Sequence, residues 1–147
     1  MGVCNVEIEQ QTFDLTATME MSYFEINPEG PSNIIHEDQE FEVDVKVVMY
    51  GRIRRHLCGV LCVEIAFHGC SGGPDWVGKQ ELPLEPCGDG TYRFKIRVPA
   101  GSLSGRECGQ IYELCVTLGS RDECGKSGVI FGTCTPDNIT IVPALTP

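Results

Sequence analysis

Nine cysteines in a chain of 147 residues are the side chains of this sequence with the clearest chemistry. Dense cysteine content is typical of proteins from oxidising compartments, where thiols pair as disulfides. Eight cysteines allow about 105 pairings, so spacing alone does not fix the connectivity. Reduced thiols that act as small apolar or surface residues are the alternative interpretation.

Metal binding is the second chemistry that these cysteines could support. Cys58 and Cys62, with His56 and His68 nearby, are the only candidate cluster. Residues four apart on one strand lie about 13 Å from one another, and zinc knuckles use a two-residue spacing that this sequence lacks. We therefore expect no metal and no other cofactor.

Catalysis is not expected either. The segment Gly69-Cys70-Ser71-Gly72-Gly73-Pro74 resembles the nucleophile segment of chymotrypsin-like proteases, with Cys70 at the position where that family has Asp. That family needs two barrels and places its His and Asp well before the Ser, but only 70 residues precede Ser71. A glycine-rich turn is the better interpretation, and we expect that the protein is not an enzyme.

Charge is distributed unevenly along the chain. The formal net charge is −10, and residues 1–50 contain eleven acids against one base, whereas the remaining residues contain ten of each. An acidic balance argues against nucleic-acid binding, which needs a basic face. Basic residues gather in two short groups, which are Arg52, Arg54 and Arg55 in one and Arg93, Lys95 and Arg97 in the other. These groups are the natural partners of the acidic first third, within one chain or between two chains.

The elements that must position these residues are strands. Apolar residues alternate with polar ones over 13–23, 41–49, 61–67, 92–98 and 112–118, and an interrupted strand is indicated over 129–141. Alternation with period two is typical of half-buried strands. Residues 69–90 are expected to form mostly a long loop. No run of about 18 apolar residues is present, so we expect no transmembrane segment.

Two segments carry a resemblance to a known fold family. Gly88-Asp89-Gly90-Thr91-Tyr92 and the strand after it are similar to the Asp-Gly-Thr-Tyr strand of immunoglobulin-like domains of the filamin and bacterial surface-protein kind. The segment His36–Phe41 resembles the approach to their second strand. The resemblance implies a single antiparallel immunoglobulin-like β-sandwich over 21–147, preceded by an N-terminal arm or extra strand over 1–20. Most such domains bind, space or assemble.

In the order of an immunoglobulin-like domain, the strands near 57–68 and 110–119 are antiparallel neighbours. Neighbouring antiparallel strands keep a constant sum of residue numbers, which is 177 for Cys62 with Cys115 and 178 for Cys70 with Cys108. These pairs are therefore expected to form disulfides, with a one-residue bulge between them. Cys124–Cys134 and Cys58–Cys87 complete the expected set, and Cys4 is left over.

Together these features predict a structural or assembly module that associates with itself. The N-terminal arm is interpreted either as an added edge strand of the same domain or as a strand that pairs with the open edge of a neighbouring copy. The expected interface comprises Phe13, Leu15, Met19, Arg52, Arg54, Arg55, Arg93, Lys95 and Arg97. Acid-to-base attraction between copies is expected to assist it.

A carbohydrate-binding module is the alternative function. In that interpretation the 69–78 loop presents Trp76 for stacking on a sugar ring, with Asp75 beside it. The sequence also gives two competing expectations for the cellular compartment. Cysteine content favours an extracellular or cell-surface location, but the first residues contain no signal peptide, so a cytoplasmic location is the competing expectation.

Overall fold

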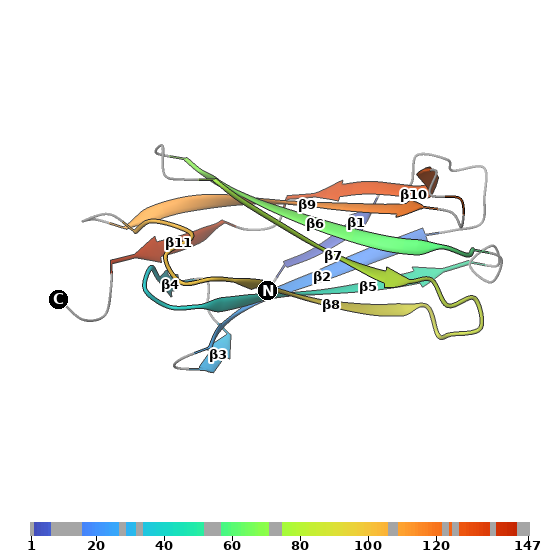
Figure 1. The fold of residues 1–147 in the computed structure, drawn as a ribbon, viewed down its shortest axis with the longest axis horizontal. Helices are drawn as coiled ribbons and strands as arrows, with labels where there is room; N and C mark the ends of the chain where they lie inside the picture. The colour runs from blue at the N-terminus through green and yellow to red at the C-terminus, as the bar shows by residue number, and fades with distance from the viewer. Residues whose placement is uncertain are drawn as a thin grey trace.

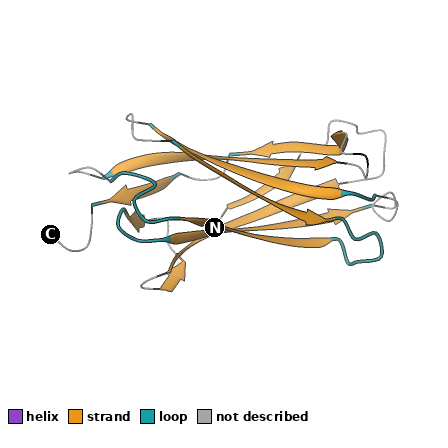
Figure 2. Cartoon of the chain, viewed as in Figure 1, coloured by secondary structure: helices purple, strands orange, loops and turns teal. Residues whose placement is uncertain are grey.

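The computed structural model describes residues 2–6, 16–26, 29–31, 34–51, 57–70, 75–105, 109–121, 124, 127–135 and 138–143. Within these ranges the chain consists of strands and loops (Figure 2), which confirms the all-β prediction. No helix in the described ranges is long and apolar enough to cross a membrane.

The strands form two sheets that face one another (Figure 1). Sheet A has the order β1 (Gly2–Val6), β2 (Thr16–Ile26), β5 (Phe41–Tyr50) and β8 (Thr91–Val98), and β3 (Glu29–Pro31) pairs with β2. Sheet B has the order β4 (Ile34–His36), β11 (Ile139–Val142), β9 (Gln110–Arg121), β6 (Val60–Gly69) and β7 (Trp76–Pro83), and β10 (Ser127–Cys134) pairs with β9. All the pairs are antiparallel except β11 with β4.

The core lies between the two sheets and follows from the alternation of apolar residues. Val43, Val45 and Val47 of β5 are buried, as are Leu61, Val63 and Ile65 of β6, whereas the residues that alternate with them are half-buried or exposed. Because successive side chains on a strand point to opposite faces, this period-two pattern gives each sheet one dry face. The dry faces of both sheets contribute to one hydrophobic cluster.

Strand predictions with strong alternation are confirmed. The predicted strands at 41–49, 61–67, 92–98 and 112–118 lie within β5, β6, β8 and β9. The interrupted strand predicted over 129–141 is two strands, β10 and β11, which pair with different parts of β9. The long loop predicted over 69–90 is wrong, because β7 occupies its middle and pairs with β6.

The N-terminal segment contributes β1 and the first part of β2 to sheet A. Strand β2 runs without interruption through residue 20 and pairs with β5 on one side and with β1 and β3 on the other. Met19 is fully buried in the core, so its prediction as an interface residue is wrong. An added edge strand was expected within residues 1–20, and the structure has β1 there, in a segment where the sequence alternation did not locate a strand. Phe13 and Leu15 lie outside the described residues.

Candidate functional site

The predicted pairing of Cys62 with Cys115 is wrong because the strand register differs by four residues. Strands β6 and β9 are antiparallel neighbours, as predicted, but Cys62 faces Gly119 and Cys115 faces Ala66. Since four residues of strand span about 13 Å, the two sulfurs are beyond the reach of a disulfide, which needs Cα atoms closer than about 7 Å. Both residues carry thiols on the outward side of sheet B.

The other predicted disulfides are not formed either. Cys70 donates its backbone N–H to the carbonyl oxygen of Ile111 at 3.1 Å, and its side chain is an exposed thiol. Cys58, Cys87 and Cys124 likewise keep their thiols. Cys134 is buried and disulfide-bonded, but not to Cys124. Cys108, the predicted partner of Cys70, lies outside the described residues.

Trp76 is not displayed on a loop as the carbohydrate alternative expects. It is the first residue of β7, is half-buried, and packs against Phe67 with 6.4 Å between ring centroids. The carboxylate of Asp75 already has partners in its own chain, because its Oδ1 lies 3.0 Å from Nδ1 of His68 and accepts a hydrogen bond from the backbone N–H of Gly69 at 3.3 Å. The residues at 71–74, within the proposed sugar-binding loop, lie outside the described ranges.

The second basic group lies on the outer face of sheet A, where the alternation places it. Arg93, Lys95 and Arg97 all point outward from β8 and are exposed. Arg97 pairs with Glu40, with 3.0 Å between Nη1 and Oε1. The first basic group, which comprises Arg52, Arg54 and Arg55, lies outside the described residues.

Three strands bring further charges beside this basic group. Across β2, β5 and β8, the register aligns Glu20 with Lys46 and Arg93 in one row, and Ser22 with Asp44 and Lys95 in the next. Side chains that lie directly opposite one another on one face of a sheet have Cβ atoms about 4.5–5.5 Å apart. The six side chains therefore form one compact, charged group on the outer face of sheet A.

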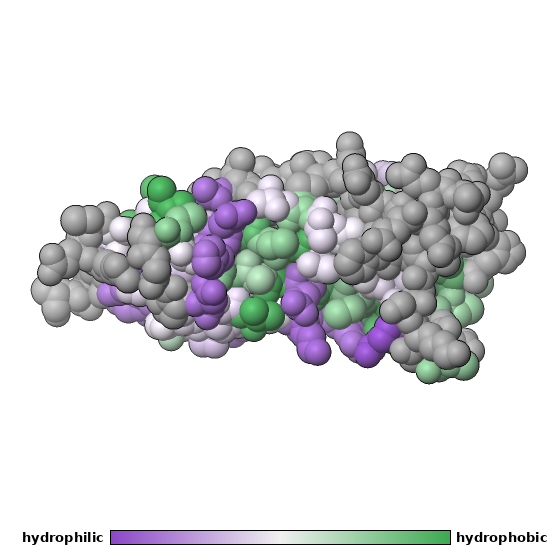
Figure 3. All heavy atoms as spheres, turned by 90° about the horizontal axis from the view of Figure 1, so that it is seen from above, coloured by the Kyte–Doolittle hydropathy of each residue, from purple (hydrophilic) through white to green (hydrophobic). Residues whose placement is uncertain are grey.

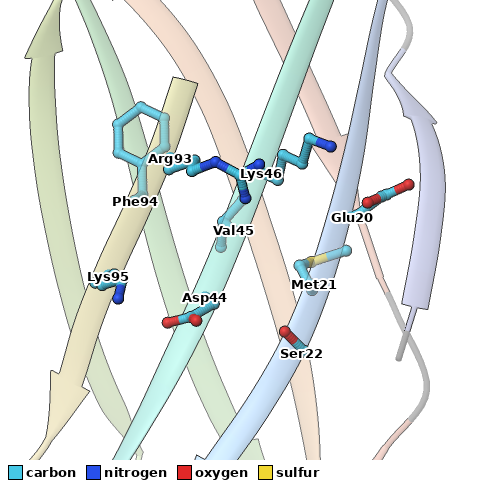
Figure 4. A pocket seen from close by; sticks show the side chains of 9 residues that line it. All are labelled: Glu20, Met21, Ser22, Asp44, Val45, Lys46, Arg93, Phe94 and Lys95. Carbon is cyan, nitrogen blue, oxygen red and sulfur yellow. The ribbon is translucent and has the colours of Figure 1, made fainter. Parts of the chain in front are cut away.

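A depression of about 240 Å³ lies at this group. We call it the charged depression, and its polar lining is Glu20, Ser22, Asp44, Lys46, Arg93 and Lys95, with Met21, Val45 and Phe94 completing the wall. Figure 4 shows Arg93 extending from β8 across β5 toward Lys46, with Asp44 on β5 between Lys95 and Ser22. The charged depression therefore combines Arg93 and Lys95, which belong to the basic group predicted from the sequence, with the acids of the N-terminal third that line it, Glu20 and Asp44.

Two carboxyl groups on β5 interact at the border of the charged depression. Glu42 and Asp44 are two residues apart and share the outer face. Burial raises the pKa of Glu42, and the negative charge of Asp44 raises that pKa further. Lys95 and Arg97 act in the opposite sense but do not cancel these effects. The structure therefore favours the protonated form of Glu42 more than water does.

The outer face of sheet B shows a banded surface instead of a depression. Across β7, β6 and β9, an apolar row of Val77, Ala66 and Cys115 lies beside a polar row of Lys79, Glu64 and Thr117. Figure 3 views this face and shows polar and apolar bands in alternation. Among the described residues, no three His, Cys, Asp or Glu side chains gather as metal ligands would.

Comparison with known proteins gives no family for this chain. No protein-family model matches it, and no curated protein matches its sequence.

Proposed function

We propose that this chain is a non-enzymatic, immunoglobulin-like interaction module that associates with a second copy of itself through its N-terminal strand. Two features support the immunoglobulin-like architecture, and the chemistry of the sheet edges supports the mode of association. An extracellular or cell-surface location stays a prediction. It was based on expected disulfides, and the structure has free thiols at the described cysteines of most of those pairs.

Strand order is the first support for an immunoglobulin-like architecture. Immunoglobulin domains pair their A, B and E strands in one sheet and their C′, C, F and G strands in the other. Here β2, β5 and β8 are neighbours in sheet A, and β7, β6, β9 and β10 are neighbours in sheet B. Strand β1 then corresponds to an addition before the first strand of such a domain.

A buried tyrosine is the second support. Near the start of β9, the hydroxyl of Tyr112 accepts a hydrogen bond from the backbone N–H of Ser104 at 3.1 Å. Tyr112 is fully buried. A tyrosine at the start of strand F, hydrogen-bonded to the backbone a few residues upstream, is a hallmark of immunoglobulin-like sandwiches.

The single observation that carries the proposed association is the difference between the two edges of sheet A. Edge strand β8 bears three exposed basic residues, and the side chain of Gln80 from β7 caps its Lys95 N–H at 2.8 Å. Charged residues and covered amides are the usual protection of edges against pairing with other chains. Edge strand β1, with the sequence Gly-Val-Cys-Asn-Val, contains no charged residue.

Exchange of β1 between copies requires few new contacts. Strand β1 is paired with residues 17–21 of β2, so the same pairing forms when β1 comes from a neighbour. Swapping an identical element in this way is a low-cost route to dimers. Two of the three basic residues of β8 already face acidic residues of β5 within one sheet, Lys95 opposite Asp44 and Arg97 opposite Glu42, so the proposed contact depends on the strand and not on charge attraction between copies.

The association is tested on the full-length chain by light scattering after size-exclusion chromatography, over a wide range of protein concentration. We expect a dimer whose fraction rises with concentration and which is lost when residues 1–6, which contain β1, are removed. The control Val77→Lys, which adds a charge to edge strand β7, is expected to leave the dimer unchanged. A wild-type chain that stays monomeric at every concentration, or a dimer that persists without residues 1–6, would contradict the proposal.

A further inference from the structure

The charged depression places two cations directly opposite one another without an anion between them. Lys46 and Arg93 are cross-strand partners on β5 and β8. Like charges in directly opposite positions destabilise a sheet. The ion pairs of the described side chains do not include either residue, nor Lys95 one row further along. This arrangement favours an anion at the depression.

A carboxylate at the same depression has an unused hydrogen-bond acceptor. Oδ1 of Asp44 is buried and has no hydrogen-bond partner in the described structure. A buried polar atom without a hydrogen bond destabilises the folded protein, and a charged one does so more strongly. Such atoms are rare in folded proteins. A ligand hydroxyl or N–H that donates to Asp44 Oδ1 would remove this cost.

The two observations together define the chemistry of the ligand. It needs one anionic group for Lys46 and Arg93, and a hydrogen-bond donor one row away for Asp44. Figure 4 shows both sets of groups at one opening over β2, β5 and β8. The volume of about 240 Å³ is slightly smaller than the range that begins near ~300 Å³ for pockets that hold drug-sized ligands. A ligand with a single ring therefore suits the space.

We propose that the charged depression binds a single sugar residue that carries one sulfate or phosphate ester. The ester group lies between Lys46 and Arg93, and a ring hydroxyl donates a hydrogen bond to Oδ1 of Asp44. Lys95, which is the cross-strand partner of Asp44, contributes positive charge from the neighbouring row. This proposal is independent of the association through β1, because it uses the outer face of β2, β5 and β8 alone.

Calorimetric titration of the full-length protein tests the anion contact, with glucose 6-sulfate, glucose 6-phosphate, glucose and inorganic sulfate as probes. We expect at least one ester to bind with Kd below about 1 mM and glucose to show no binding. Arg93→Gln should weaken ester binding about tenfold, the loss expected for one charge-assisted hydrogen bond. The matched control Arg97→Gln, which removes the same charge from the same face of β8, should change it less than about twofold, because Arg97 is paired with Glu40.

Asp44→Ala tests the sugar contact separately from the anion contact, because alanine has no acceptor for the ring hydroxyl, whereas asparagine would keep one. The variant also loses a negative charge near the anion, so the affinity for inorganic sulfate should stay unchanged or rise, while the ratio of ester affinity to inorganic sulfate affinity should fall. Comparison of the two esters identifies the source of the ligand, since a sulfated glycan favours the sulfate ester and a metabolite favours the phosphate ester.

Lys46→Gln keeps the proposal testable if other variants fold poorly. It removes the like-charge pair with Arg93 and the opposite-charge pair with Glu20, so the melting temperature of the unliganded protein should stay close to that of the wild type, while ester binding falls about tenfold. A residue with a purely structural role would not lower binding without also lowering the melting temperature. Failure of both esters to bind, equal affinity for ester and inorganic sulfate, or binding insensitive to Arg93→Gln and Lys46→Gln would overturn the proposal.

Discussion

Removing one hydroxyl group tests how the segment before β9 is fixed to the core. The Tyr112→Phe variant keeps the buried ring, so it removes only the hydrogen bond that the Ser104 N–H donates to the tyrosine hydroxyl at 3.1 Å. Loss of such a bond, with the partly buried N–H left without this acceptor, costs about 1–2 kcal/mol. For a chain of this length each kcal/mol lowers Tm by about 2–4 °C, so we expect a Tm lower by about 2–8 °C.

Urea unfolding provides the assay, because the chain has one tryptophan and that residue packs against the core. Trp76 fluorescence reports the surroundings of Phe67 and the first residues of β7, and far-UV circular dichroism reports the sheets as a whole. The urea midpoint should fall with an unchanged slope, which is the signature of a change in stability alone. Coincident curves from the two probes would establish that the unfolding is two-state.

Tyr92→Phe is the matched control for this experiment. The hydroxyl of Tyr92 accepts the backbone N–H of Glu85 at 3.0 Å, but Glu85 is exposed, so water can replace the lost acceptor. We expect the control to lose less than about 1 kcal/mol. The reasoning is refuted if Tyr112→Phe is as stable as the wild-type protein, or if the control loses more stability than Tyr112→Phe does.

Three further predictions follow from single contacts and charges. Gly105→Ala should lower stability by about 1–3 kcal/mol in a thermal melt, because its Cβ would overlap the backbone at the end of β11; an unchanged Tm would contradict this contact. Burial, and to a lesser extent the charge of Asp44, raises the pKa of Glu42 in the folded protein, so stability is lost as pH rises through that folded-state pKa. Glu42→Gln should therefore raise Tm near neutral pH and leave it unchanged at about pH 3. Cys62 should react with iodoacetamide more slowly than the exposed Cys115 in a peptide mass-mapping time course, because burial raises the pKa of its thiol and only the thiolate reacts; equal rates would contradict this.

The alternation of apolar and polar residues predicted the strands that have one buried face and one solvent-exposed face. In β5 and β8 every second residue is buried, and the sequence shows the same period. Strand β7 was missed because it lies at the edge of sheet B, where residues alternate between exposed and half-buried and include Gly78, Gln80 and Pro83. Its pairing with β6 comes from backbone contacts that leave no apolar signature in the sequence.

Register explains why the predicted cysteine pairs failed although their strands are neighbours. A shift of four residues keeps the face of every side chain, so the outward orientation of Cys62 and Cys115 was predictable from parity while their alignment was not. The same limit applied to the charged depression. Alternation placed Arg93 and Lys95 on a wet face, but only the register across three strands brings Asp44 and Lys46 beside them.

The offset between the two outward thiols of sheet B limits which covalent products oxidation can form there. Cys62 and Cys115 share a face but are separated along the strands by about 13 Å, so neither can close a bridge to the other within one folded chain. A disulfide at either of these two sulfurs therefore needs a different thiol as its partner, and that thiol can come from a second copy of the protein. Two copies joined in this way would sit back to back across sheet B, with the charged depression of each copy turned outward and accessible.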